Sequence, residues 1–229
     1  MEKTIGILGG MGPMATADLF TKIVSLTKAG CDNDHIRIYI DNNSKIPDRT
    51  QAILYGGKDP LPYMLESAKK LEQMGADCLI MPCNTAHYFY EPLSKAVSIP
   101  FLHLIEEAAK LVQEGRRPGL LATTATVQTG LYAKALEKYG FEAIVPDEEY
   151  QKLSMEAIFD VKGGTVPNKE HFESLLEHLK SKGADIFILG CTEMPIAFQW
   201  LDIKEPFVDP TSALAKAAIR FCGKDVNEN

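Results

Sequence analysis

The sequence lacks both an apolar stretch long enough to cross a bilayer and an export signal at its start. Residues 1–5 do not combine a cationic lead with an apolar core. No later apolar run approaches the roughly 20 residues that a membrane helix needs. We therefore expect a cytoplasmic protein with no membrane partner.

Clusters of basic residues are also missing. Lys and Arg are scattered along the 229 residues, and the formal net charge is −7 with a pI near 5.3. This balance does not favour nucleic acid or an anionic membrane as a partner.

The five cysteines are odd in number and irregularly spaced, unlike the disulfide framework of a small secreted protein. We expect them to be reduced thiols.

What the sequence does contain is an internal duplication. Residues 75–85 nearly repeat residues 183–193, and each copy ends an apolar run on a cysteine, Cys83 or Cys191. Two further pairs of segments match in the same order and at similar separations: 6–10 with 119–123, and 100–103 with 206–209. This pattern indicates two homologous halves, because the repeat units of a solenoid would be much shorter.

Each half alternates short apolar runs with amphipathic segments. Strands are predicted over residues 4–8, 36–40, 78–81 and 101–104, and again over 119–122, 142–145, 186–189 and 207–208. Helices are predicted between them, among others over residues 60–74, 85–97 and 105–114, with a loop at 47–50. The alternation predicts an α/β protein of two pseudo-symmetric doubly wound domains, each with a mostly parallel four-stranded sheet.

Cys83 and Cys191 follow predicted strands, at the sheet edge where ligands of open parallel sheets bind. A helix is expected to begin after each, and a helix N-terminus lowers the pKa of a nearby thiol. We therefore expect at least one of the two to rest as a thiolate, the alternative being two buried structural thiols. Cys31, Cys78 and Cys222 have no equivalents in the other half and are expected to be packing or surface residues.

Two weaker patterns leave other functions open. His87 lies four residues after Cys83, on the same helical face, which fits a metal pair, although no second ligand pair follows. An orienting contact with Cys83 is the favoured role. Residues 10–15 match G-x-G-x-x-A, with Asp41 at the end of the next strand, which fits a dinucleotide. The same glycines also let backbone N–H groups approach a carboxylate.

Arg49 is a candidate carboxylate clamp, because a guanidinium group binds a carboxylate through two parallel hydrogen bonds. A solvated surface role is the alternative for an arginine in a loop. Spacing alone selects neither Arg49 nor Lys162, which lies at the end of a predicted helix.

Five motifs occur in order along nearly the whole chain: residues 6–13 (GILGGMGP), 46–50 (IPDRT), 82–87 (PCNTAH), 120–124 (LLATT) and 190–193 (GCTE). With these motifs the chain resembles the cofactor-independent aspartate racemases of the aspartate/glutamate racemase superfamily. Glutamate racemases of this superfamily usually open with an acid-serine-glycine turn where this chain has Gly-Gly-Met-Gly at residues 9–12. That departure disfavours a cell-wall glutamate racemase but leaves glutamate open as a second substrate.

The resemblance implies a PLP-independent enzyme without a metal or any other cofactor. It places the active site between two domains, residues 1–104 plus 210–229 and residues 105–209. Cys83 and Cys191 would be the two proton-transfer groups, one removing the α-proton from one face while the other donates to the opposite face. A homodimer is the expected assembly.

The resemblance also implies which residues bind the substrate, a small acidic amino acid. Arg49 and Lys162 match the partners of the side-chain carboxylate, and Asn84, Thr85 and Thr192 match groups at the α-carboxylate end. The full set of expected substrate-binding residues is Arg49, Thr50, Asn84, Thr85, Ala86, Thr124, Lys162 and Thr192.

Racemisation of aspartate, and also of glutamate, is the leading hypothesis. Maleate cis–trans isomerases and arylmalonate decarboxylases use related folds, the former with two cysteines and the latter with one. The presence of both cysteines disfavours the decarboxylase. A non-catalytic two-lobed protein that closes on an acidic ligand is the third alternative.

Overall fold

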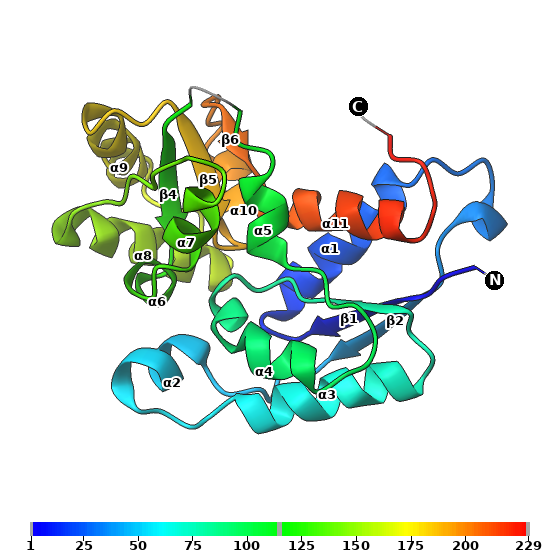
Figure 1. Cartoon of the computed structure of the whole chain (residues 1–229). Coiled ribbons are helices and arrows are strands. Elements are labelled where there is room, and N and C mark those ends of the chain that lie inside the picture. Colours follow the sequence, from blue (N-terminus) through cyan, green and yellow to red (C-terminus); the bar gives the residue numbers. More distant parts are fainter. Residues whose placement is uncertain (1, 114–115, 228–229) are drawn as a thin grey trace. The chain divides into compact units, whose positions relative to one another are not determined.

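The computed structural model describes residues 2–113 and 116–227, and the chain divides into two compact units (Figure 1). The first unit comprises Met1–Glu107 with Thr211–Asn229, and the second comprises Ala108–Pro210. The predicted helix end at residue 114 and the predicted domain ends at residues 1 and 229 lie outside the described residues. Within the described ranges, no helix is both long enough and apolar enough to span a membrane.

The first unit is a parallel sheet of order β2-β1-β3 with helices packed on it. Its elements are β1 (Ile5–Gly9), α1 (Pro13–Leu26), η1 (Asp32–Asp34), β2 (Ile38–Asn42), α2 (Arg49–Tyr55), α3 (Leu61–Gln73), β3 (Cys78–Ile80), η2 (Thr85–Phe89), α4 (Tyr90–Lys95), the start of α5 (Leu104–Ala109) and α11 (Pro210–Phe221). Every residue of β1 is buried, as expected for a central strand that pairs on both sides. Ile5 is paired with Ile38 on one side and with Cys78 on the other.

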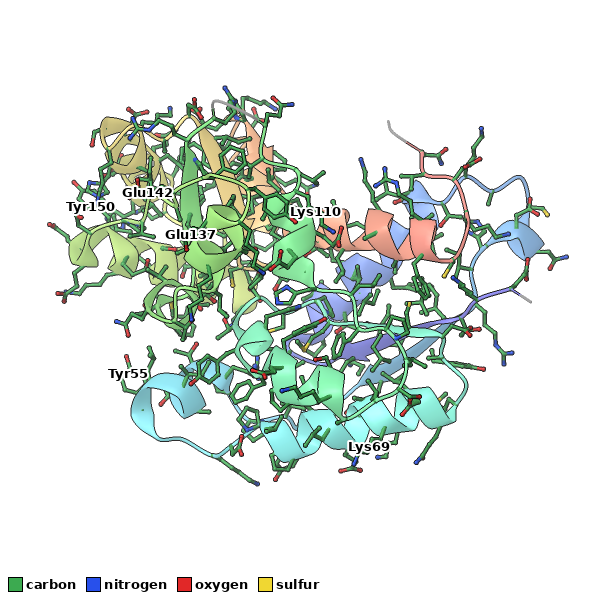
Figure 2. All side chains as sticks on the ribbon, in the orientation of Figure 1. Tyr55, Lys69, Lys110, Glu137, Glu142 and Tyr150 are labelled. Atoms are coloured by element: carbon green, nitrogen blue, oxygen red, sulfur yellow. The ribbon has the colours of Figure 1, made fainter. Side chains whose placement is uncertain are left out.

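Helix α3 shows how sequence spacing positions the core of this unit. Met64, Ala68 and Leu71 recur at helical spacing and are fully buried against the sheet. Lys69, between them in sequence, is exposed on the outer side of the helix (Figure 2). The helix therefore covers one face of the sheet with a single apolar stripe.

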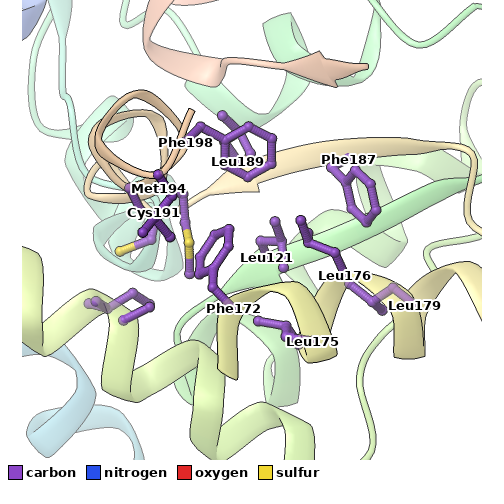
Figure 3. Packing of buried hydrophobic residues seen from close by; sticks show 14 of the residues in the cluster. Leu121, Phe172, Leu175, Leu176, Leu179, Phe187, Leu189, Cys191, Met194 and Phe198 are labelled. Atoms are coloured by element: carbon purple, nitrogen blue, oxygen red, sulfur yellow. The ribbon is translucent and has the colours of Figure 1, made fainter. Parts of the chain in front are cut away.

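The second unit is a parallel sheet of order β4-β5-β6. Its elements are β4 (Pro118–Ala122), α6 (Thr124–Gln128), α7 (Leu131–Glu137), α8 (Glu148–Lys162), α9 (Lys169–Ser181), β5 (Ile186–Gly190), α10 (Met194–Trp200) and β6 (Phe207–Val208). The core joins strand residues such as Leu121 and Leu189 to Phe172 and Leu176 of α9, as Figure 3 shows. Cys191 lies at the border of this apolar cluster.

The predicted fold class is confirmed, but each sheet has three strands in the described residues instead of four. The missing member is a single bridge in each unit, Phe101 beside β3 and Ile144 beside β4. A proline adjoins each segment, Pro100 and Pro146, and proline has no N–H to donate to a ladder. With the bridges included, each sheet has four positions, β2-β1-β3-Phe101 and Ile144-β4-β5-β6. The spatial order is the same in both units: the second segment along the chain lies at one edge, followed by the first, the third and the fourth.

The loop predicted at residues 47–50 is wrong for its second half, because α2 begins at Arg49. Asp48 caps this helix: its Oδ1 accepts a hydrogen bond of 2.7 Å from the backbone N–H of Gln51. The cap allows helix α2 to begin only two residues after Pro47.

The helix predicted over residues 85–97 is a 3₁₀ turn, η2, followed by the short helix α4. In an α-helix the carbonyl of Cys83 would accept from the backbone N–H of His87. Here the ring of His87 contacts that carbonyl, and its backbone N–H donates to the carbonyl of Asn84 at 3.0 Å. The tighter turn follows from this side-chain contact.

The turn after β1 generates a test of local packing. Gly10 has a φ of +89°, and a Cβ there would lie 2.3 Å from the carbonyl carbon of Asn43. Gly56 has a φ of +65°, but no atom lies within 4 Å of its Cβ position. We expect Gly10→Ala to lower the free energy of unfolding by about 1–3 kcal/mol more than Gly56→Ala, because only the first adds a steric clash to the backbone strain. Chemical denaturation of both variants measures the difference, and equal losses would contradict the clash.

Candidate active site

Cys83 lies in the turn between β3 and η2 and is only 7% exposed. The Nδ1 of His87 is 2.7 Å from the Cys83 carbonyl oxygen, and the Leu104 N–H donates to Nε2 at 3.2 Å. Since Nε2 accepts, the ring proton is on Nδ1 and is donated to the carbonyl. Burial, with a smaller contribution from His103, lowers the pKa of His87 to about 3. His87 is therefore neutral and holds the backbone of Cys83, in line with the orienting role favoured for it.

The residues directly after Cys83 are buried as a group. Asn84, Thr85 and Ala86 form the start of the η2 turn, and each is at most 6% exposed. Their position at the carboxyl end of β3 places four of the predicted site residues in one short turn.

Arg49 is held by backbone carbonyl groups of the first unit. Its Nη1 donates to the Pro47 oxygen at 2.9 Å, and its Nη2 lies 3.5 Å from the Met11 oxygen. Its Nε is buried and has no hydrogen-bond partner. A buried N–H without an acceptor is costly, which favours a ligand oxygen at this position. Helix α2, which carries Arg49 and the half-buried Thr50, contacts η2.

Cys191 follows the last residue of β5 and is also 7% exposed. Its Sγ donates to Oε2 of Glu193 at 2.9 Å, and the Thr192 hydroxyl donates to the same oxygen at 3.2 Å. Burial, and next the charge of Glu193, raise the pKa of Cys191 well above its ordinary value. Cys191 therefore rests as a thiol.

The expected effect of a helix N-terminus does act on Cys191 but is outweighed. Helix α10 begins at Met194, and the backbone N–H of Glu193, the residue before it, lowers the pKa of Cys191 by less than burial and the Glu193 carboxylate raise it. A buried carboxylate within hydrogen-bonding distance opposes a thiolate more strongly than the partial charge of a short helix favours it.

Two further predicted residues lie near the strand ends of the second unit. Lys162 ends α8, and its positive charge acts on Cys191 in the direction that lowers the thiol pKa, against the larger effects that raise it. Thr124 begins α6 directly after β4. The side-chain amide of Gln151 donates to the Ala122 oxygen at 2.9 Å and lies 3.5 Å from the Thr124 hydroxyl, so α8 fixes this strand end.

The predicted site residues therefore form one group in each unit. The first-unit group is Arg49, Thr50, Cys83, Asn84, Thr85 and Ala86, and the second-unit group is Thr124, Lys162, Cys191 and Thr192. Both groups lie at the carboxyl ends of parallel strands or on helices that adjoin them.

The two weaker patterns receive structural explanations. In the described part of the chain, no group of three or more His, Cys, Asp or Glu side chains is arranged to hold a metal ion. A Cβ at Gly9 would lie 2.5 Å from the Thr16 side chain, and one at Gly10 would meet the backbone of Asn43. Internal packing thus requires these glycines whether or not a ligand binds nearby.

Glu193 lies in the GCTE motif, but the sequence alone assigned no role to its side chain. It is 9% exposed, and its carboxylate accepts from both Cys191 and Thr192. The available signal was an acidic residue two positions after a cysteine at a strand end. The turn that follows the strand brings these two side chains together.

The sequence matches the Asp/Glu/Hydantoin racemase family over residues 8–218. It is 31% identical over 226 residues to the broad specificity amino-acid racemase RacX of Bacillus subtilis (strain 168), covering 94% of this chain and 96% of that protein. Its structure is similar to Picrophilus torridus aspartate racemase, with a TM-score of 0.85 and 32% identity over 99% of this chain and 96% of that one. An aspartate racemase homologue from Pyrococcus horikoshii OT3, PH1733, has a TM-score of 0.76 at 25% identity, covering 97% and 100% of the two chains.

The chain belongs to the Asp/Glu/Hydantoin racemase family. Together with its racemase relatives, this membership identifies an amino-acid racemase, an isomerase that acts on small amino acids.

The buried histidine predicts a pH dependence of folding. Its pKa is about 3 in the folded chain and near 6.5 when exposed, so acidification protonates the unfolded state first. Stability is therefore lost as the pH falls from about 6.5 towards 3, by up to about 1.4 kcal/mol per pH unit from this group. We expect His87→Gln to have a shallower slope of the unfolding free energy against pH than the wild type. An unchanged slope over that range would show that His87 is not the group that titrates.

The contact between Cys191 and Glu193 predicts a change in thiol reactivity. Glu193→Gln removes the charge but keeps the side-chain size, so the pKa of Cys191 should fall while burial still holds it high. We expect alkylation of Cys191 at about pH 8 to become faster by up to roughly tenfold, because the thiolate is the reactive form. Mass spectrometry follows the reaction, with the exposed Cys31 as the internal control in the same sample. Equal or slower alkylation in the variant would contradict the electrostatic role.

Proposed function

We propose that this enzyme racemises an acidic amino acid, aspartate first and glutamate also, without PLP and by two-base proton transfer through Cys83 and Cys191. The observation that carries the proposal is the equivalence of the two cysteines. Each follows the third strand position of its unit, each is buried, and each lies next to polar turn residues. The two thiols would act on opposite faces of the substrate Cα.

The protonation of Cys191 supports a division of labour between the thiols. With Cys191 as a thiol, Cys83 takes the α-proton as a thiolate, and Cys191 gives its proton to the other face. In the opposite direction Cys191 must first lose its proton. Oε2 of Glu193, 2.9 Å from Sγ, is placed to accept it, so that Cys191 and Glu193 share one proton between them.

Charges near the thiols support a substrate with two carboxylate groups. Arg49 is fixed through Nη1 and still has a buried Nε to donate, so its Nε and Nη2 edge can bind a carboxylate side-on. Lys162 supplies a second positive charge in the unit of Cys191. Asn84, Thr85 and Thr192 would hold the α-carboxylate end, and Thr50, Ala86 and Thr124 complete the set of substrate-binding residues.

Two relatives support an amino-acid substrate, one with a narrow and one with a broad specificity in its name. The Picrophilus torridus protein is named an aspartate racemase, and the Bacillus subtilis protein a broad specificity amino-acid racemase. The fixed Arg49 and the charge of Lys162 near Cys191 favour an acidic substrate, and a panel of amino acids tests the breadth.

We further propose that residues 1–104 with 210–229 and residues 105–209 act as the two domains that hold the substrate, and that the enzyme is a homodimer, which light scattering would test. The reaction needs both thiols reduced, which favours a cytoplasmic location.

Isotope incorporation tests the reaction. Purified protein is incubated with L-aspartate in deuterated water, and both enantiomers are separated and weighed by mass spectrometry. We expect D-aspartate carrying deuterium at Cα, while the remaining L-aspartate stays largely unlabelled at early times, because separate groups remove and add the proton. Glutamate, other amino acids and maleate are run in parallel. Absence of exchange with every amino acid would sink the proposal, and loss of maleate absorbance would favour the isomerase alternative.

Substitution of each thiol tests the two-base assignment. We expect Cys83→Ala and Cys191→Ala each to lower kcat for racemisation by roughly 10³-fold, since each removes a proton-transfer group. Cys31→Ala, at an exposed cysteine, is the matched control and should keep wild-type activity. Normal racemisation by either active-site variant would show that one thiol suffices.

A further inference from the structure

A second pair of cysteines lies in the first unit and has no place in the proposed reaction. Cys78 is the first residue of β3 and is fully buried. Cys222 follows the last residue of α11 and is partly exposed. The two are far apart in sequence and come from a strand and a helix of the same unit.

Contacts of Lys3 bring the end of α11 to the start of the sheet. The Lys3 ammonium group donates to the Phe221 carbonyl at 2.9 Å and lies 4.0 Å from the centre of the Phe221 ring. The next residue, Thr4, donates through its backbone N–H to the Asp77 carboxylate at 2.7 Å. Lys3 therefore contacts Phe221, the residue before Cys222, and Thr4 contacts Asp77, the residue before Cys78.

The two thiols meet at this corner. The side chains of Cys78 and Cys222 are in contact with each other, and this contact lowers the pKa of Cys222, with a further contribution from the charge of Lys3. The same contact and burial raise the pKa of Cys78. Cys222 is the more exposed of the two sulfurs and is the one that an oxidant reaches first, with the buried Cys78 sulfur next to it.

We propose that Cys78 and Cys222 form a reversible thiol–disulfide site that closes when a peroxide oxidises Cys222. The Cys222 thiolate attacks a peroxide oxygen and becomes a sulfenic acid, while the O–O bond breaks and, with hydrogen peroxide, one water leaves. The Cys78 sulfur then attacks the sulfenic sulfur, the S–S bond forms, and a second water leaves. Two thiols are oxidised and one peroxide is reduced; a dithiol reductant reverses the bond.

The bond would join β3 to the C-terminal helix of the same unit. It closes a long covalent loop that includes the whole second unit, and a long loop restricts the unfolded chain strongly. The oxidised protein is therefore expected to unfold at a higher temperature than the reduced protein.

The test uses the full chain treated with hydrogen peroxide, alkylated under denaturing conditions and mapped by mass spectrometry. We expect an intramolecular peptide link between Cys78 and Cys222, with a mass lower by two hydrogen atoms, that disappears on treatment with dithiothreitol. Cys31→Ser is the matched control and should form the link as the wild type does. In Cys222→Ser, Cys78 should stay alkylatable and the unfolding temperature should not respond to peroxide.

Cys78→Ala isolates the first step. In this variant Cys222 should stop at the sulfenic acid, which dimedone traps. If the variant does not fold, the wild type and Cys222→Ser decide the question through the link itself. The proposal is overturned if Cys78 stays fully alkylatable while Cys222 reaches the sulfinic acid, or if either residue links to Cys31 or to a second chain instead. Because the link is read by mass, its absence is distinct from a failure of racemisation.

Discussion

The constraint on which the molecule depends is the pairing of parallel strands around fully buried central strands, β1 in the first unit and β4 and β5 in the second. Parallel strands deliver their last residues to one edge, and every backbone polar group along them must be paired. Both units meet this demand with the same four positions, although one position in each is a single bridge. Cys83 and Cys191 both follow the third position, so a duplicated scaffold places the same side chain at the same edge twice.

The duplicated backbone carries different electrostatics in its two copies. Near Cys83, a neutral His87 binds the backbone carbonyl of the cysteine. Near Cys191, the carboxylate of Glu193 binds the thiol and keeps its proton in place. The proposed two-base reaction needs one base and one acid at any moment, and the carboxylate beside Cys191 favours the acid form at that position.

Much of the scaffold was predictable from the sequence, because periodicity reports which face of an element is buried. The repeat revealed the two halves, and the apolar runs located β1, β3, β5 and β6 within a residue or two. Periodicity does not say which polar atoms meet. The direction of the Cys191 pKa depends on burial and on one carboxylate oxygen, and the 3₁₀ turn after Cys83 depends on a ring nitrogen. The pairing of Cys78 with Cys222 likewise required the three-dimensional fold, since nothing in their spacing connects them.

Strand β3 has a thiol at its start and another just beyond its end. The five steps from Cys78 to Cys83 correspond to a separation on the order of 15 Å along an extended chain, so chemistry at one edge does not reach the other. At the amino-terminal edge, Cys222 is partly exposed and near Lys3, and both features favour attack by an oxidant. At the carboxyl edge, Cys83 is nearly buried, as is Cys191 in its own unit. Exposure thus distinguishes Cys222, where an oxidant can attack, from Cys83 and Cys191, whose proposed reaction requires that they stay reduced.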